Sequence, residues 1–539
     1  MPLTHLRRLG SGHVLATGAH LPYRAVVTQP GERHVVRSEL AGSSVATVSV
    51  ERPIACIAHM TDLHVTDVQS PARFEFLNRE FSDPRFVKLV PVQRPQEALT
   101  PHALNALISA LNTGMTGPLT HAPLELVLTG GDAIDNAQQN EIRAFTQLLD
   151  DGHVQLNSGS STYEGVQSAA WPDDIFWRPD GGPGEPDLFR RDYGFPLIPG
   201  LLDRALRPID ATGLRVPWLG CHGNHETLCQ GVGVVTPALA AAFVGGDKPI
   251  ELPPAIDRDT AHETFVTRPE AFLASPSRVV TPDPGRRYCS LEDFVSAHTA
   301  PGMPARHGFD DRNLSSRTAY YAHDTESIRF IVLDTGCPAG SADGCIGDEQ
   351  VHWLEQRLIE VHASYRANDG GDVETGNEDR LVVIVSHHGS QVLGNNRPHA
   401  DGSEFGAGSR LLPTLLRVDN VVLWLNGHTH THAIRPRPDP SGIGGGLWEV
   451  TTGSFVDWPC QARLIEIFDV GDGTVAIAST LIDHDGPADP ARAETQLELA
   501  GLHRQLAGNS PWAGFDSGRA GTPLDRNVIL LRHMATGIP

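Results

Sequence analysis

Five short apolar runs, each ending abruptly in a polar tip, constrain the fold of this chain most strongly. They cover residues 54–60, 124–129, 216–220, 381–386 and 421–426, and the tips that follow begin TDLH, GGD, CHGNHE, HHGS and GHTH. Continuous runs this short and this rich in Val, Ile and Leu are typical of strands that are buried on both faces. The run 328–334 has the same character. We therefore predict a core built on sheets whose strands end in polar residues.

Helical patterns lie between several of these runs. Apolar residues recur at helical spacing over residues 97–112, 136–150 and 348–365. This alternation of strands and helices favours an α/β fold, in which ligands bind where the strands reach their carboxyl ends. Toward the C-terminus, three more segments are predicted to form strands, namely 446–454, 463–470 and 474–482.

The chain is too long to form a single compact domain without insertions. It has 539 residues, whereas a single hydrophobic core stops growing near ~250–300 residues. Two stretches, 151–214 and 231–316, are rich in Pro, Gly and Asp and show little periodicity. We predict a domain at 51–500 that carries both stretches as large loop insertions, which cap its ligand site. Residues 1–50 would form an N-terminal extension and residues 501–539 a C-terminal tail.

The charge of the chain disfavours some classes of partner. It carries 42 Lys and Arg against 65 Asp and Glu, a net charge of −23, which disfavours binding to nucleic acid or to an anionic membrane. No apolar stretch reaches the ~18 residues that a membrane-spanning helix needs. Arg7 and Arg8 are not followed by an apolar run, so we find no recognisable export signal. We expect a cytoplasmic protein, in which the seven scattered cysteines are free thiols, although Cys337 and Cys345 could form a disulfide in an oxidising compartment.

The polar tips carry a set of side chains that suits a metal centre. They are Asp62, His64, Asp132, Asn224, His225, His387, His388, His428 and His430. Carboxylate, imidazole and amide groups are ligands for Mn, Fe or Zn, and the absence of cysteine from the set argues against a structural zinc site. Each tip alone has a plainer explanation as a turn or a helix cap. Five tips that each follow a buried strand favour one shared metal site.

Taken in order along the chain, the motifs TDLH, GGD, GNHE, SHHG and GHTH resemble those of the calcineurin-like metallophosphoesterase superfamily, and most closely a bacterial branch with long inserts between motifs. The resemblance spans roughly residues 54–482. It implies a four-layer α/β/β/α sandwich with two metal ions at one sheet edge. Some relatives of that branch are exported, which this N-terminus does not support. Asp135 stands where the purple acid phosphatases place a metal-bound tyrosine, which argues against that coloured ferric subgroup.

The resemblance also implies a role for each matching residue. The first ion would be held by Asp62, His64 and His430. The second would be held by Asn224, His428 and one histidine of the pair His387–His388, and Asp132 would bridge the two ions. We favour His387, because the ligand of the family usually follows the strand directly, and His388 stays open. His225 would be the acid that protonates the oxygen of the leaving group.

The chemistry of these residues agrees with the implied activity. Hydrolysis of a phosphoester needs neutralisation of charge on the phosphoryl oxygens and a nucleophile at neutral pH, and two metal ions about 3.5–4 Å apart supply both. We therefore predict a phosphoesterase with two divalent or trivalent ions (Mn, Fe or Zn), in which a metal-bound hydroxide attacks a small phosphorylated substrate. The sequence leaves open whether that substrate is a phosphate monoester or a diester.

Two other functions use the same residues. A nuclease of this fold would need a basic groove, which the net charge disfavours, and a non-catalytic metal-binding scaffold would be expected to lack some ligands. The insertions contain no motif that identifies a substrate, and the pairs Arg190–Arg191 and Arg286–Arg287 are expected on the solvated surface. The sequence does not determine the oligomeric state.

Overall fold

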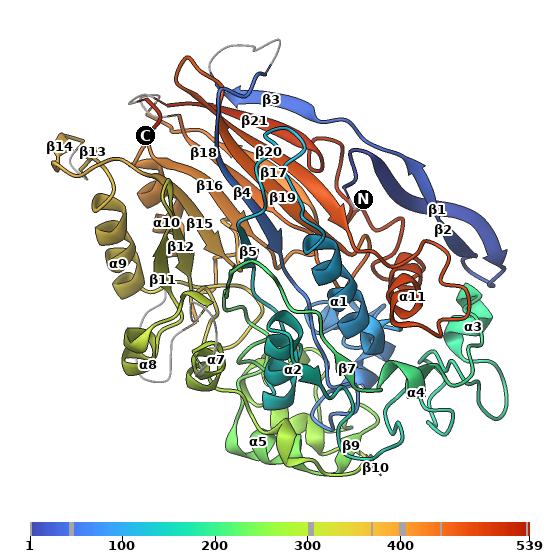
Figure 1. Cartoon of the computed structure of the whole chain (residues 1–539). Helices are drawn as coiled ribbons and strands as arrows, with labels where there is room; N and C mark the ends of the chain where they lie inside the picture. Colours follow the sequence, from blue (N-terminus) through green and yellow to red (C-terminus); the bar gives the residue numbers. More distant parts are fainter. Residues whose placement is uncertain are drawn as a thin grey trace.

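Two mixed sheets form the centre of the protein (Figure 1). The computed structural model describes residues 3–41, 48–299, 307–367, 370–397, 406–441, 445–534 and 537–539. The seven-stranded sheet has the order β3 (Val35–Leu40), β21 (Val528–His533), β20 (Thr474–Asp483), β19 (Gln461–Asp469), β4 (Arg52–Met60), β5 (Leu126–Thr129) and β8 (Trp218–Leu219). β4, β5 and β8 run parallel, so their carboxyl ends lie at one edge.

The six-stranded sheet holds the other predicted strands. Its order is β11 (Tyr321–Asp324), β12 (Ile328–Leu333), β15 (Leu381–Ser386), β16 (Val421–Asn426), β18 (Leu447–Thr451) and β17 (Ala433–Arg437). The four central strands β12, β15, β16 and β18 are parallel to one another, and the edge strands β11 and β17 are antiparallel to them. The protein therefore has an α/β fold with multi-stranded mixed sheets, as the sequence predicted.

The apolar runs are continuous because both faces of these strands are covered. In β12, Phe330 and Val332 belong to a core cluster shared with residues of the seven-stranded sheet. The alternate residues Ile331 and Leu333 belong to a second cluster with α9 (Asp348–Ile359) and α10 (Gly408–Leu416). Successive side chains of a strand point to opposite faces, so each face meets its own partner.

Helices of the predicted segments cover the other sheet. α1 (Thr100–Leu111) and α2 (Gln139–Leu149) contribute buried residues such as Leu107 and Phe145 to the shared core, and α11 (Gln496–Gly508) packs against α1. The helix predicted at 348–365 is shorter than expected. It ends at Ile359, because β13 (Ser364–Arg366) pairs with β14 (Asp372–Glu374) as a separate hairpin.

The two aperiodic stretches contain only short elements. Residues 151–214 hold β6 (His153–Val154), α3 (Leu188–Tyr193), α4 (Leu201–Ala205) and β7 (Ile209–Asp210). Residues 231–316 hold α5 (Pro237–Val244), β9 (Asp247–Pro249), α6 (Ala261–Thr267), β10 (Ser277–Val279), α7 (Leu291–His298) and α8 (Asp311–Ser316). Residues 300–306 of the second stretch lie outside the described residues. One expectation about these stretches is wrong: Arg286 is not solvated but fully buried, with Nε 3.0 Å from Asp67 Oδ2.

Residues near both termini take part in the core. β1 (Arg7–Ala16) and β2 (Tyr23–Pro30) form a hairpin, whereas β3 and β21 pair with each other inside the seven-stranded sheet. The division into extension, domain and tail stays a prediction, but segments 1–50 and 501–539 both supply strands to the sheet. All seven cysteines are buried. Within the described residues, no helix has both the length and the apolar character needed to cross a bilayer.

Candidate metal centre

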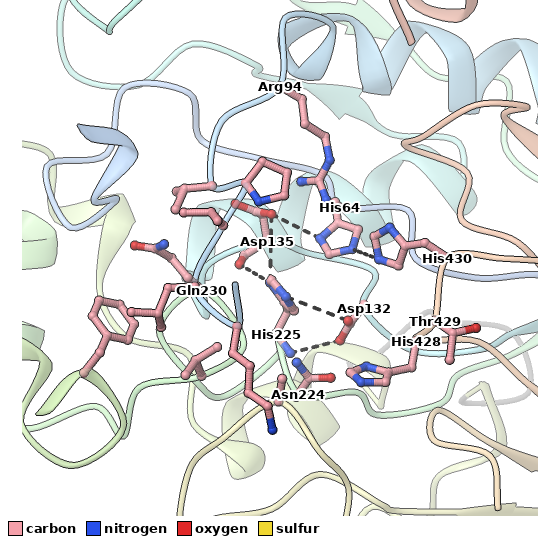
Figure 2. Close-up of a pocket in the computed structure, with 18 of the residues that line it drawn as sticks. His64, Arg94, Asp132, Asp135, Asn224, His225, Gln230, His428, Thr429 and His430 are labelled. Atoms are coloured by element: carbon pink, nitrogen blue, oxygen red, sulfur yellow. Dashed lines mark hydrogen bonds and ion pairs between the residues drawn. The ribbon is translucent and has the colours of Figure 1, made fainter. Parts of the chain in front are cut away.

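The polar tips of the two sheets meet in one place. His430 Nε2 lies 3.2 Å from Asp62 Oδ1, although the two residues follow strands of different sheets. His387 Nε2 lies 3.0 Å from Asp132 Oδ2, again across the two sheets. Figure 2 shows His64, Asp132, Asn224, His225, His428 and His430 around the same pocket. The structure thus brings together residues that are more than 360 positions apart in the sequence.

Two of the histidine donor atoms face each other directly. His64 Nε2 lies 3.3 Å from His430 Nε2, while the Nδ1 atoms of both rings are paired with carboxylates. Two ligand atoms that are each about 2.1 Å from one ion lie roughly 3.0–3.4 Å apart, which matches these separations. Asn224 Oδ1 is buried and forms no hydrogen bond within the described part of the chain. The donor set therefore fits a metal centre.

The donors fall into overlapping groups in which all ligand atoms lie within 4.8 Å of one another. These groups are Asp62–His64–His430, Asp62–Asp132–His387, His387–His388–His428 and His64–Asp135–His225. Asp62, His64 and His387 each belong to two groups, and Asp132 shares one group with Asp62 and His387. Overlapping groups of this kind can hold two ions that share a ligand.

The protein orients its histidines through their second nitrogen. His64 Nδ1 lies 3.1 Å from Asp135 Oδ1, and His430 Nδ1 lies 2.7 Å from Asp457 Oδ2. His387 Nδ1 lies 2.8 Å from the carbonyl oxygen of Gly130. Partners of this kind fix the tautomer that leaves Nε2 free as a ligand. Asp457 is a residue that the sequence prediction missed.

The buried charges of the centre favour the binding of a cation. Burial lowers the pKa of His64 to about 4 and that of His428 to about 3, which keeps both rings neutral. Burial acts in the same direction on His387, but the carboxylate of Asp132 outweighs it and raises the pKa of His387 to about 10. A cation at this point would take the place of that proton, because metal ligation requires the neutral ring.

The two histidines of the SHHG motif differ in their surroundings. His388 uses both nitrogens, since Nδ1 lies 2.9 Å from Thr335 Oγ1 and Nε2 lies 2.9 Å from the carbonyl oxygen of Ala342. His387 uses only Nδ1 in this way and turns Nε2 toward Asp132. The arrangement favours His387 over His388 as a ligand.

The backbone of the centre is unusual. Five of the predicted ligands have a positive φ between 48° and 65°, namely Asp62, His64, Asp132, His428 and His430. Such left-handed residues are uncommon outside glycine, although Asp and His are enriched among them, and they cluster at functional sites. The motif glycines allow close approach: a Cβ atom on Gly223 would lie 2.3 Å from Asp132 Oδ1.

His225 occupies a different position from the ligands. Its Nδ1 donates to the carbonyl oxygen of Asp135 at 2.6 Å, and its backbone N–H donates to Asp132 Oδ1 at 2.9 Å. Its Nε2 lies 4.0 Å from Asp132 Oδ2, and the ring remains partly exposed in the pocket. Figure 2 shows the ring between Asp132 and Asp135. Gly231 makes room for it, because a Cβ atom there would lie 2.2 Å from His225 Cδ2.

The pocket over the centre is a cavity of about 230 Å³. Its wall away from the donors comes from the segment 88–94, from Gln230, from Val232 and Phe265 in the second aperiodic stretch, and from Arg519 near the C-terminus. Of the described residues, those of 151–214 contribute nothing to this wall. The second stretch therefore borders the site, whereas the first does not.

Comparisons with known proteins give little further information. No protein-family profile matches the chain, and no curated protein matches it. Solved structures do match, and one of them is a dimetal phosphatase from Danio rerio. It is 11% identical, with a TM-score of 0.33, and the match covers 80% of this chain and 99% of that one. A likeness this distant does not establish a family for the chain.

The contact between His430 and Asp457 allows a test of metal binding. We expect Asp457→Asn to weaken metal affinity roughly 10- to 100-fold, because removing such a partner of a ligand histidine usually has an effect of this size. Metal titration followed by calorimetry measures the change. Asp334→Asn is the matched control, since Asp334 holds Nδ1 of His222, which does not line the cavity. Equal affinity for metal in the Asp457 variant and the control would contradict the assignment.

Proposed function

We propose that the protein is a dinuclear-metal phosphoesterase with the four-layer α/β/β/α arrangement. The observation that carries the proposal is the position of Asp132, whose carboxylate lies against His387 and adjoins the group formed by Asp62, His64 and His430. One ion would be held by Asp62, His64 and His430, and the other by Asn224, His387 and His428. Asp132 would bridge them.

Each chemical requirement of the reaction can then be assigned to residues of the site. When bound, a pair of metal ions supplies Lewis acidity toward the phosphoryl oxygens and a nucleophile at neutral pH. Asp62 and Asp132 leave part of the positive charge of the ions uncompensated, so that the centre attracts a phosphate in an otherwise acidic protein. His225 donates through Nδ1 to Asp135, which directs Nε2 into the cavity, where it can protonate the leaving-group oxygen.

The alternatives have less support. A nuclease needs a groove that follows a nucleic-acid backbone, whereas the cavity over this centre is about 230 Å³ and the net charge is −23. A scaffold without catalysis would be expected to lack donors, and here all seven predicted ligands contribute to or adjoin one centre.

Metal removal tests the proposal. Protein stripped with EDTA is expected to lose hydrolysis of p-nitrophenyl phosphate and to regain it with Mn²⁺. Restored metal should also stabilise the fold, by about 4 kcal/mol when its concentration is 1,000 times the Kd, because ions bind the folded state. Activity and denaturant unfolding are both measured. A scaffold would show the gain in stability without turnover, and that result would refute the enzymatic proposal.

A further inference from the structure

Charged side chains besides the donors line part of the cavity. Among the described residues they are Lys88, Arg94, Asp135 and Arg519. Lys88 is balanced by Asp343, with Nζ 3.0 Å from Oδ2. Asp135 belongs to a buried group in which two cations, Arg73 and Lys248, face three carboxylates, Asp135, Glu75 and Glu97. The other two cations of the wall are Arg94 and Arg519.

These two arginines share a single carboxylate. Arg94 Nε donates to Asp457 Oδ1 at 2.9 Å, and Arg519 Nη1 lies 3.4 Å from Asp457 Oδ2. The same Oδ2 atom also accepts from His430 Nδ1. Two guanidinium groups thus meet one carboxylate at the edge of the centre and line the cavity there. Cations placed beside a metal centre favour the binding of an anion between them.

The guanidinium of Arg94 retains free donors. The residue is 92% buried, yet its two terminal nitrogens donate no hydrogen bond to any residue that the structure describes. Figure 2 shows the side chain reaching down toward His64. Because the side chain lines the cavity, these nitrogens are available to donate to a ligand or to water there.

Arg519 is held in place by the loop that carries the donors. Its carbonyl oxygen accepts from the backbone N–H of His432 at 3.0 Å, and its Nη1 lies 3.5 Å from the carbonyl oxygen of His430. A residue far outside the motifs is thus fixed beside the first group of donors. Guanidinium groups bind phosphate oxygens through two parallel hydrogen bonds when they are held in this way.

We propose that Arg94 and Arg519 bind the non-bridging oxygens of a phosphate monoester, and that the enzyme is therefore a monoesterase. The proposal rests on the proposed function and deepens it. With two dications bound, the carboxylates of Asp62 and Asp132 would leave part of the positive charge of the centre uncompensated. The arginines around Asp457 add hydrogen-bond donors beside it. A monoester carries a charge of about −1.5 to −2 at pH 7 and offers three terminal oxygens to these groups, whereas a diester carries only about −1 and offers two.

The shape of the cavity favours the same substrate. Its volume of about 230 Å³ is below the ~300–1,000 Å³ of pockets that enclose a drug-sized ligand. Leu89, Val92 and Val232 form an apolar part of the wall, which suits the organic group of an ester better than a charged oxygen. The second ester group of a diester would have to replace oxygen contacts with the arginines.

Binding of two small anions to the metal-loaded full-length protein tests the proposal without turnover. At pH 8, calorimetry should show that inorganic phosphate binds more tightly than dimethyl phosphate. Arg519→Gln is expected to weaken phosphate binding roughly 10- to 100-fold, as for the loss of charge-assisted hydrogen bonds, and to change dimethyl phosphate binding less than about 3-fold. Arg312→Gln is the control, because it removes the same charge from an exposed side chain that does not line the cavity.

Kinetics with matched esters completes the test. Wild-type protein should have a higher kcat/KM for p-nitrophenyl phosphate than for bis(p-nitrophenyl) phosphate, and Arg519→Gln should remove most of that preference. Arg519→Lys, which keeps the charge but loses the planar fork, should fall between them. An equal loss on both esters, or a wild-type preference for the diester, would overturn the monoester proposal. If neither ester is hydrolysed by protein with two bound ions, the proposed function fails, and phosphate binding still decides the role of the arginines.

Discussion

Replacing Asp132 by alanine is expected to lower turnover more than about 1,000-fold, because the metal ions would no longer stabilise the transition state by several kcal/mol. Each loss of about 1.4 kcal/mol slows the reaction about tenfold. The protein should also bind fewer than two ions, as measured by elemental analysis. The carboxylate lies 3.0 Å from His387 Nε2 and is the proposed bridge between the ions.

Two further variants separate this effect from damage to the fold. Asp132 Oδ1 accepts the backbone N–H of His225, and Asp132→Asn keeps an oxygen for that bond while removing the charge. Asp334→Ala removes a carboxylate that pairs with His222, a histidine that does not line the cavity. This variant should retain two ions and activity. Two tightly bound ions in Asp132→Ala would show that the residue is not the bridge.

Replacing His225 by alanine should lower turnover about 10²- to 10⁴-fold, the usual contribution of a positioned acid, while both ions remain bound. The loss should be smaller for p-nitrophenyl phosphate than for an alkyl phosphate, because p-nitrophenolate leaves without needing a proton. A rate comparison of the two esters measures this difference.

His222→Ala serves as the control, since His222 is close in the chain but pairs with Asp334 and does not line the cavity. His225 also forms, with His64 and Asp135, a group of ligand atoms that could hold a metal ion. Loss of an ion from the His225 variant would therefore assign it as a ligand, and equal losses on both esters would exclude the role of acid.

The strands buried on both faces were the easiest part of the fold to predict. β15 and β16 coincide with the runs 381–386 and 421–426, because burial on two faces demands an unbroken apolar sequence. β1 was missed for the opposite reason: it pairs only with β2, and most of its residues are at least partly exposed. Its pairing depends on a partner strand and not on its own pattern.

The donor residues were predictable because strand ends in parallel sheets gather at one edge. Asp457 follows β18 by six residues at the same edge, and the same rule would have pointed to it. Arg94 and Arg519 lie outside regular helices and strands, where no periodicity marks them. Their places depend on tertiary contacts, such as the bond between His432 and the carbonyl oxygen of Arg519. The ligand roles themselves stay predictions.

The left-handed backbone at five donor positions limits how this centre can change during evolution. A β-branched residue at Asp62 or His430 would be strained before any question of metal affinity arose, whereas asparagine tolerates that conformation. Mutational drift at these positions is therefore confined to a narrow set of side chains by geometry alone. A library that seeks altered metal preference would do better to vary the neighbours of the donors than the donors themselves.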